Sequence, residues 1–181
     1  MRKKPVGINN PHQRGVSLIE TLMGMMLVAV LIFLAMPSWS RHMEKENLRA
    51  AVESLLGDLY LLRSEAVQRN KSMTIQFSTG TFWCYGLSEG SPSTCQCTTA
   101  PQLCTIGGVP RLISYNNFKN IRLVSSTFAN NQTGFESTRS LALQVGSWLL
   151  QSSSGLSVTV TLNAVGMVQA CSNNFSNFPP C

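Results

Sequence analysis

Six cysteines carry the most specific chemistry in this 181-residue chain, and all of them follow a long apolar run near the N-terminus. They are Cys84, Cys95, Cys97, Cys104, Cys171 and Cys181. Cysteines either form disulfide bonds in an oxidising compartment or bind zinc as thiolates. The sequence contains no CxxC pair, and its two histidines, His12 and His42, lie far from every cysteine. We therefore predict disulfide bonds and no metal site.

The last two cysteines are the pair whose partnership we predict. Cys171 and Cys181 enclose a nine-residue loop that ends in two prolines, so we expect them to bond to each other. The loop would then hold the C-terminus in place and present Phe175 and Phe178 to a neighbouring molecule. For the other four cysteines we expect two bridges, in an order that the sequence leaves open.

Residue types that support catalysis are scarce. After the basic start of the chain there is one histidine, His42, and one aspartate, Asp58, and both lie in a stretch with helical periodicity. A Ser/His/Asp triad, a pair of catalytic carboxylates or a phosphate-binding loop therefore has nothing to be built from. We predict a protein that is not an enzyme and needs no cofactor.

Glu20 is the remaining residue that calls for a chemical partner, because no other charged residue follows it until Arg41. The apolar run from Val16 to Met36 has 21 residues, or about 32 Å of helix, which is enough to span a bilayer. A carboxylate is costly in lipid. Basic residues before the run put that side in the cytoplasm by the positive-inside rule; they are Arg2, Lys3, Lys4 and Arg14.

The helix should continue beyond the membrane as an amphipathic segment that ends near Asn70. Its apolar residues recur at spacings of three and four, which is typical of a helix packed on a sheet; they are Leu48, Val52, Leu55, Leu59, Leu62 and Ala66. From Lys71 the period changes to two. We expect a first hairpin over 71–87, a loop over 88–108, and strands at 111–115, 121–126, 141–145, 156–162 and 166–171. The predicted fold is α+β, with one long helix on an antiparallel sheet and disulfide-stapled loops.

The N-terminal residues resemble the class III signal of type IV pilins and type II secretion pseudopilins. A basic leader ends in Gly15, and the apolar helix that follows has Glu20 as its fifth residue and Pro37 as its twenty-second. The resemblance implies that a prepilin peptidase cleaves between Gly15 and Val16 and methylates Val16. It also implies that Glu20 pairs with the N-terminus of a neighbouring subunit, which offsets the cost of both buried charges. Pro37 is expected to kink the helix.

Two downstream stretches, "LRSEAVQRNKSMTIQF" and "WCYGL", are similar to the GspH/FimT-type minor pilins and pseudopilins. The resemblance implies a pilin fold with a leader over 1–15, a membrane-spanning and filament-core helix over 16–39, and a periplasmic or extracellular globular domain over 40–181. The chain would lie in the inner membrane as a single-pass protein with a cytoplasmic N-terminus, and then in a pilus or pseudopilus at the cell surface. Its partners would be other pilin or pseudopilin subunits, the prepilin peptidase and the inner-membrane assembly platform.

The function expected from this resemblance is that of a minor pilin, a structural subunit involved in assembling a type IV pilus. One alternative is a GspH-type pseudopilin of a type II secretion system. Another is a DNA-binding receptor pilin of a competence pilus. A membrane-anchored domain without processing is a fourth interpretation.

The charge distribution argues against nucleic-acid binding. The net charge of +6 falls to +2 without residues 1–15, because 10 basic and 8 acidic residues remain. Some relatives bind DNA through a Gly-Arg-x-Arg element, but the corresponding stretch here has Gly166 followed by Met167 and Gln169 in place of the arginines. We therefore expect no nucleic-acid partner. The basic residues of the sheet region are scattered in sequence; they are Arg111, Lys119, Arg122 and Arg139.

Overall fold

The structure is a computed structural model that describes residues 15–99 and 103–181, with the backbone alone for residues 35–38. It separates into two compact units, residues 1–39 and residues 40–181, and each is described by itself. One helix, α1 (Leu18–Arg69), contributes its first part to the first unit and its remainder to the second.

In the first unit α1 begins directly after Ser17. The Ser17 carbonyl accepts hydrogen bonds from the backbone N–H groups of Glu20 and Thr21, at 3.0 and 3.2 Å. Every side chain over residues 18–34 is exposed. Among the described residues α1 is the one helix long and apolar enough to cross a membrane. Such a helix, with apolar side chains on all sides, is suited to a lipid environment. The helix runs through Pro37, whose side chain lies outside the described residues, so the kink stays a prediction.

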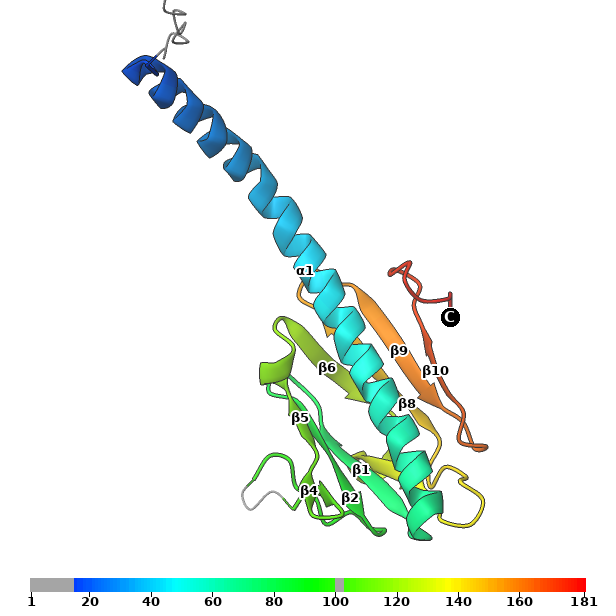
Figure 1. The fold of residues 1–181 in the computed structure, drawn as a ribbon. Helices are drawn as coiled ribbons and strands as arrows, with labels where there is room; N and C mark the ends of the chain where they lie inside the picture. Colours follow the sequence, from blue (N-terminus) through cyan, green and yellow to red (C-terminus); the bar gives the residue numbers. More distant parts are fainter. Residues whose placement is uncertain (1–14, 100–102) are drawn as a thin grey trace, which may run out of the picture. The chain divides into compact units, whose positions relative to one another are not determined.

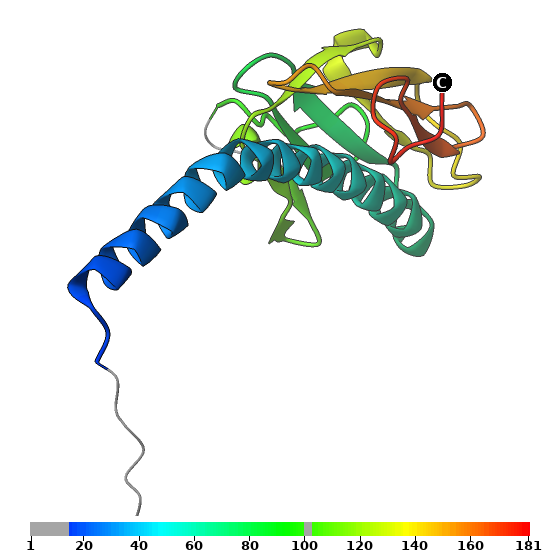
Figure 2. The same ribbon diagram turned by 90° about the horizontal axis from the view of Figure 1, so that it is seen from above.

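In the second unit the rest of α1 lies on one side of the β-strands, as Figure 1 shows face-on and Figure 2 shows from above. The apolar stripe predicted from the sequence is confirmed as the buried side of the helix. Each of its residues is at most 3% exposed: Leu48, Val52, Leu55, Leu59, Leu62 and Ala66. Asn70 follows the last helical residue with a φ of 49°, the left-handed conformation that commonly ends a helix.

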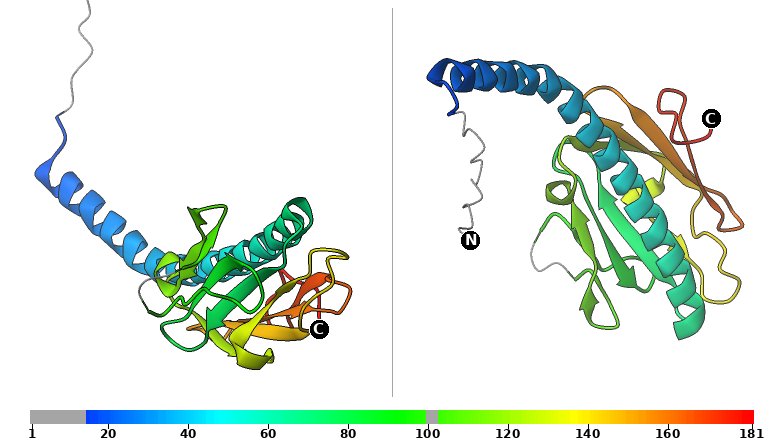
Figure 3. Two further views of the ribbon diagram at one scale, coloured as in Figure 1. Left: turned by 90° about the horizontal axis from the view of Figure 1, so that it is seen from below. Right: turned by 45° about the horizontal axis from the view of Figure 1, so that its top comes forward.

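The strands form two four-stranded sheets and a small hairpin, all antiparallel, and the antiparallel α+β fold class is therefore confirmed. The first sheet has the order β5-β2-β1-β7 and the second the order β10-β9-β8-β6. A bridge between Gly80 and Leu123 joins them. The views in Figure 3 show both sheets beside the same helix. The strands are β1 (Met73–Ser78), β2 (Cys84–Glu89), β3 (Thr105–Ile106), β4 (Val109–Pro110), β5 (Leu112–Ser114), β6 (Ile121–Ser126), β7 (Gln132–Phe135), β8 (Gly146–Ser152), β9 (Ser157–Leu162) and β10 (Val168–Cys171). Two short 3₁₀ helices, η1 (Tyr115–Asn117) and η2 (Ala129–Asn131), lie between them.

The expected strand over 141–145 is wrong. That segment makes a single bridge, between Ala142 and Phe135, and the strand begins one residue later as β8. The sequence reading also missed β7 and the β3–β4 hairpin. β8 opens with Gly146 and Ser147, which have weak strand preference, and its buried alternation starts only at Trp148.

The core lies between α1 and the sheets and contains both tryptophans that the globular unit possesses. Trp83 and Trp148 are each 1% exposed. The Trp83 indole Nε1–H donates a hydrogen bond to the Ile121 carbonyl, with 2.7 Å between the heavy atoms. That bond satisfies the one polar group of a buried indole and ties the residue before β2 to the start of β6.

Candidate assembly site

The proposed processing site lies in open space at the start of the first unit. Gly15 and Val16 are exposed and precede the helix, and no heavy atom lies within 4 Å of the place where a Cβ on Gly15 would stand. A peptide bond in an exposed segment ahead of a helix is accessible to a protease. The leader residues 1–14, which would complete the site, lie outside the described residues.

Glu20 lies in the first turn of α1 and has no partner within its own chain. Its side chain is exposed, and no hydrogen bond or ion pair joins its carboxylate to another residue in the part of the chain that the structure describes. A negative charge in the first helical turn is stabilised by the helix dipole, but only by about 0.3–1 kcal/mol. That is less than the cost of a carboxylate in lipid, so the charge still lacks compensation.

In the globular unit two disulfides cover the face of β2 that points away from α1. They join Cys84 to Cys97 and Cys95 to Cys104, with Cα–Cα distances of 5.9 and 4.5 Å. Gly86 makes room for them, because a Cβ there would stand 2.4 Å from the Cys95 sulfur and 2.5 Å from the Cys104 sulfur. This is the bridge order that the sequence left open.

The third disulfide joins Cys171 to Cys181, the two residues expected to pair, at a Cα–Cα distance of 4.9 Å. The expectation that their loop presents two phenylalanines to a neighbour is wrong. Phe175 is only 4% exposed, and Phe178 packs against the core with its ring centroid 5.7 Å from that of Phe175. The loop is instead anchored to the sheet, since the Ser172 hydroxyl donates a hydrogen bond to the Ser157 carbonyl at 2.6 Å.

A polar cluster that the sequence reading missed lies in the interface between α1 and β2. The Tyr85 hydroxyl donates a hydrogen bond to the Asp58 carboxylate at 2.8 Å and lies 3.2 Å from the Ser54 hydroxyl. Burial raises the pKa of Asp58, against the opposing effects of the Tyr85 hydrogen bond and the positive charge of Arg111. Burial and the Asp58 charge raise the pKa of Tyr85 well above its usual range, so the phenol stays protonated.

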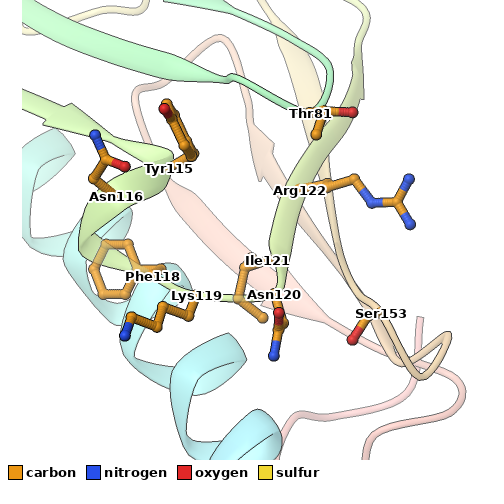
Figure 4. Close-up of a pocket in the computed structure, with 9 residues that line it drawn as sticks. All are labelled: Thr81, Tyr115, Asn116, Phe118, Lys119, Asn120, Ile121, Arg122 and Ser153. Carbon is orange, nitrogen blue, oxygen red and sulfur yellow. The ribbon is translucent and has the colours of Figure 1, made fainter.

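The four basic residues of the sheet region do not gather into one patch. The positive charge of Arg111 opposes the rise in the pKa of Asp58. The Nε of Arg139 lies 4.0 Å from the carboxylate Oε1 of Glu136. Lys119 and Arg122 line the same surface pocket, but Figure 4 shows them extending in opposite directions. The absence of a nucleic-acid partner stays a prediction.

The turn that corresponds to the DNA-binding element of some relatives is tied to the helix. Gly166 has a φ of 76°, and the Arg63 guanidinium donates hydrogen bonds to the carbonyls of Gly166 and Val165 at 3.1 and 3.4 Å. Met167 and Gln169 are exposed there and supply no charge. Within the described ranges, no group of three or more metal-binding side chains comes together.

Comparison with known protein families gives a match over most of the globular unit. The family model described as "Type II transport protein GspH" matches residues 51–166, which include most of the globular half of α1 and all strands up to β9. No curated protein and no solved structure matches the chain.

Proposed function

The chain belongs to the GspH family of pilin-like structural subunits, and from this premise we propose that it is a minor pilin that takes part in assembling a type IV pilus. Membership of the family gives a minor pilin or pseudopilin role in type IV pili or type II secretion, assembled with other such subunits. We propose the pilus in preference to the secretion system.

One observation carries the proposal. A single helix joins an apolar half whose side chains are all exposed over residues 18–34 to a half whose apolar stripe is buried on the sheets. The exposed half needs an apolar environment, which lipid supplies before assembly and neighbouring helices supply in a filament. A helix with these two surroundings suits a subunit that passes from membrane to filament.

The proposed sequence of events begins in the inner membrane, with the N-terminus in the cytoplasm and the globular domain, residues 40–181, in the periplasm. A prepilin peptidase removes the leader, residues 1–15, and methylates Val16. The assembly platform then extracts residues 16–39 into the filament. There Glu20 meets the N-terminus of a neighbouring subunit, and Pro37 allows the helix to bend. The chain performs no catalysis in this scheme.

A type II secretion pseudopilin is the second candidate, and the description of the matching family as a type II transport protein favours it. Deleting the gene and measuring both outputs separates the two. For a minor pilin we expect loss of surface pili and of the subunit from the sheared-pilus fraction, with normal protein secretion. Normal piliation with failed secretion would replace the pilus assignment by the secretion one.

A further inference from the structure

The first turns of α1 inside the globular unit are bonded to two surface loops. The Glu44 carboxylate accepts hydrogen bonds from the Ser153 hydroxyl and from the Ser154 N–H, the latter at 2.8 Å. The Asn47 side chain donates a hydrogen bond to the Lys119 carbonyl at 3.4 Å. The β8–β9 turn and the loop before β6 therefore lie beside residues 44–47 of the helix.

These loops are held close to the membrane by chain connectivity. If residues 16–39 span the membrane, as the proposed function requires, then Asn47 lies seven residues beyond Ser40, or about 10 Å of helix. Lys119 is hydrogen-bonded to Asn47. Its distance from the end of the span is therefore short, whatever direction the spanning segment takes.

The same loops form a pocket of about 420 Å³ that is shown in Figure 4. Aromatic groups stand at its edge: Tyr115 lines it, and the neighbouring Phe82 is 72% exposed, with its ring in edge contact with Tyr115 at 5.1 Å. Exposed aromatic side chains next to a membrane span are typical of the lipid–water interface. None of the described residues that line this pocket is acidic, and the Glu44 carboxylate reaches its edge through the hydrogen bond from Ser153.

Positive charge outweighs negative charge at this end of the unit, where four basic residues face the carboxylates of Glu44 and Glu46. Arg41, Lys45, Lys119 and Arg122 are exposed, and none of them forms an ion pair with another described residue. Of the acids on this part of the helix, Glu44 is engaged by the β8–β9 turn and Glu46 is exposed. Because Lys119 and Arg122 extend in opposite directions, they match a broad anionic surface better than one small anion.

We propose that this surface, the headgroup face (Arg41, Lys45, Phe82, Tyr115, Lys119 and Arg122), contacts the anionic phospholipid headgroups of the membrane while the subunit is stored there. The chain is already anchored, so the contact costs little translational entropy, and a few cations suffice. Each cation near an anionic leaflet strengthens such a contact about fivefold. The face holds the globular unit against the membrane and releases it when the subunit is extracted.

An acidic segment of a neighbouring subunit is the other occupant that this charge would accept. The lipid is favoured because connectivity alone brings the face to the membrane, while the aromatic pair Phe82 and Tyr115 suits the interface region. The inference rests on the proposed function, since it needs residues 16–39 in the membrane.

The test is hydrogen–deuterium exchange of the full chain in nanodiscs of phosphatidylcholine alone or with phosphatidylglycerol. We expect the amides of residues 115–122 to exchange at least about fivefold more slowly with the anionic lipid. The protection should disappear at 1 M salt, where the screening length is only about 3 Å. It should also disappear in the double variant Lys119→Gln/Arg122→Gln, but persist in the control Arg139→Gln, whose loop lies at the far end of the sheets (Figure 1).

A second measurement reports on the aromatic edge. In a Trp39→Phe background, Phe82→Trp introduces an exposed indole into a unit whose other two indoles are buried. Lipids brominated near the headgroup end of their acyl chains should quench the fluorescence of this indole. Equal exchange of residues 115–122 in both lipids would overturn the proposal, as would equal protection by soluble glycerol phosphate. Protection seen only in assembled filaments would assign the face to a neighbouring subunit instead. Fast exchange of residues 18–34 in nanodiscs would reject the membrane span itself, and with it the proposed function.

Discussion

The phenol of Tyr85 on β2 donates a hydrogen bond to the carboxylate of Asp58 on α1, with 2.8 Å between the two oxygens. Burial raises the pKa of Asp58 above its usual value, while this bond and Arg111 pull it down. The contact between α1 and β2 therefore contains a carboxylate whose ionisation lowers the stability of the fold.

The first prediction concerns the pH dependence of this cost. A raised folded-state pKa means that the protonated carboxyl stabilises the fold, fully below the unfolded value of about 3.9. That contribution is lost as the pH rises through the folded-state pKa. Asp58→Asn keeps an acceptor for Tyr85 and has no charge to bury. We expect the variant to have a higher unfolding free energy than the wild type at pH 7, and no advantage at pH 4.

Urea unfolding of the full chain in detergent, followed by the fluorescence of the buried tryptophans, measures this difference. The pKa of Glu89 is lowered chiefly by the hydrogen bond from the Gly107 N–H. Glu89 therefore makes the same contribution to the pH dependence of stability in both proteins, and this contribution cancels in the comparison. As a matched control, Tyr85→Phe removes the donor and should cost about 1.5–3 kcal/mol at pH 7. A wild type more stable than Asp58→Asn at pH 7 would contradict the first prediction.

The second prediction concerns Gly86, because a Cβ there would collide with the sulfurs of Cys95 and Cys104. Gly86→Ala should prevent the Cys95–Cys104 bridge from closing, at a cost of roughly 3 kcal/mol for a loop of that length. Non-reducing peptide mapping would show free or rearranged thiols. Gly57→Ala is the control: its Cβ meets nothing within 4 Å, so in a helix interior it should stabilise by about 0.5–1 kcal/mol.

The helix and the alternating strands were predictable because each depends on a local period. The buried stripe from Leu48 to Ala66 follows the helical repeat, and the alternation from Met73 to Phe77 follows the pleat of β1. β7 gave no such signal. It contains Gly134, which is needed because a Cβ there would stand 2.0 Å from the Met73 carbonyl oxygen of the neighbouring strand. A contact of that kind depends on the partner strand and cannot be seen in the local sequence.

The sequence did not predict the pairing of the first four cysteines or the hydrogen bond between Asp58 and Tyr85. Both require knowing which face of β2 turns toward α1 and which toward the loop. With that face known, Tyr85 points at Asp58, 27 positions earlier in the chain, and Gly86 leaves space for the bridge on the other side. The processing and assembly residues remain predictions, which rest on one continuous N-terminal stretch of the sequence.

The third prediction is cleavage after Gly15. Intact-mass measurement of the protein purified from its host should give a chain that begins at Val16, increased by one methyl group. Gly15 lies in open space, so Gly15→Ala should fold normally and slow the cut only partly, whereas Gly15→Phe should block it. Recovery of the full-length chain from wild-type cells, or of a cut near Ser38, would refute the assignment.

The fourth prediction is that Glu20 acts in assembly and not in folding. Glu20→Ala removes a carboxylate that has no partner within the described chain, so membrane insertion and the globular unit should be unchanged. The amount of the variant in the sheared-filament fraction should fall at least tenfold, which corresponds to a loss of about 1.4 kcal/mol in the free energy of assembly. Thr21→Ala, which removes only a hydroxyl bonded to the Leu18 carbonyl, is the neighbouring control. Equal incorporation of Glu20→Ala and wild type would rule out the role.

The last prediction is weak binding of duplex DNA. Arg111 and Arg139 are each near a carboxylate, which leaves Lys119 and Arg122 as the unpaired cations of the sheet region in the part that the structure describes. Each phosphate contact adds about one unit to the salt dependence of binding, so two cations supply little affinity to a ligand free in solution. The headgroup face meets lipid at a high effective concentration because the chain is anchored in the membrane, whereas duplex DNA must bind from solution. We expect a Kd weaker than about 100 µM for the full chain in neutral detergent at ~150 mM salt. A polarisation titration that gave a low-micromolar Kd would contradict this, and Lys119→Gln/Arg122→Gln would then show whether these two residues carry the binding.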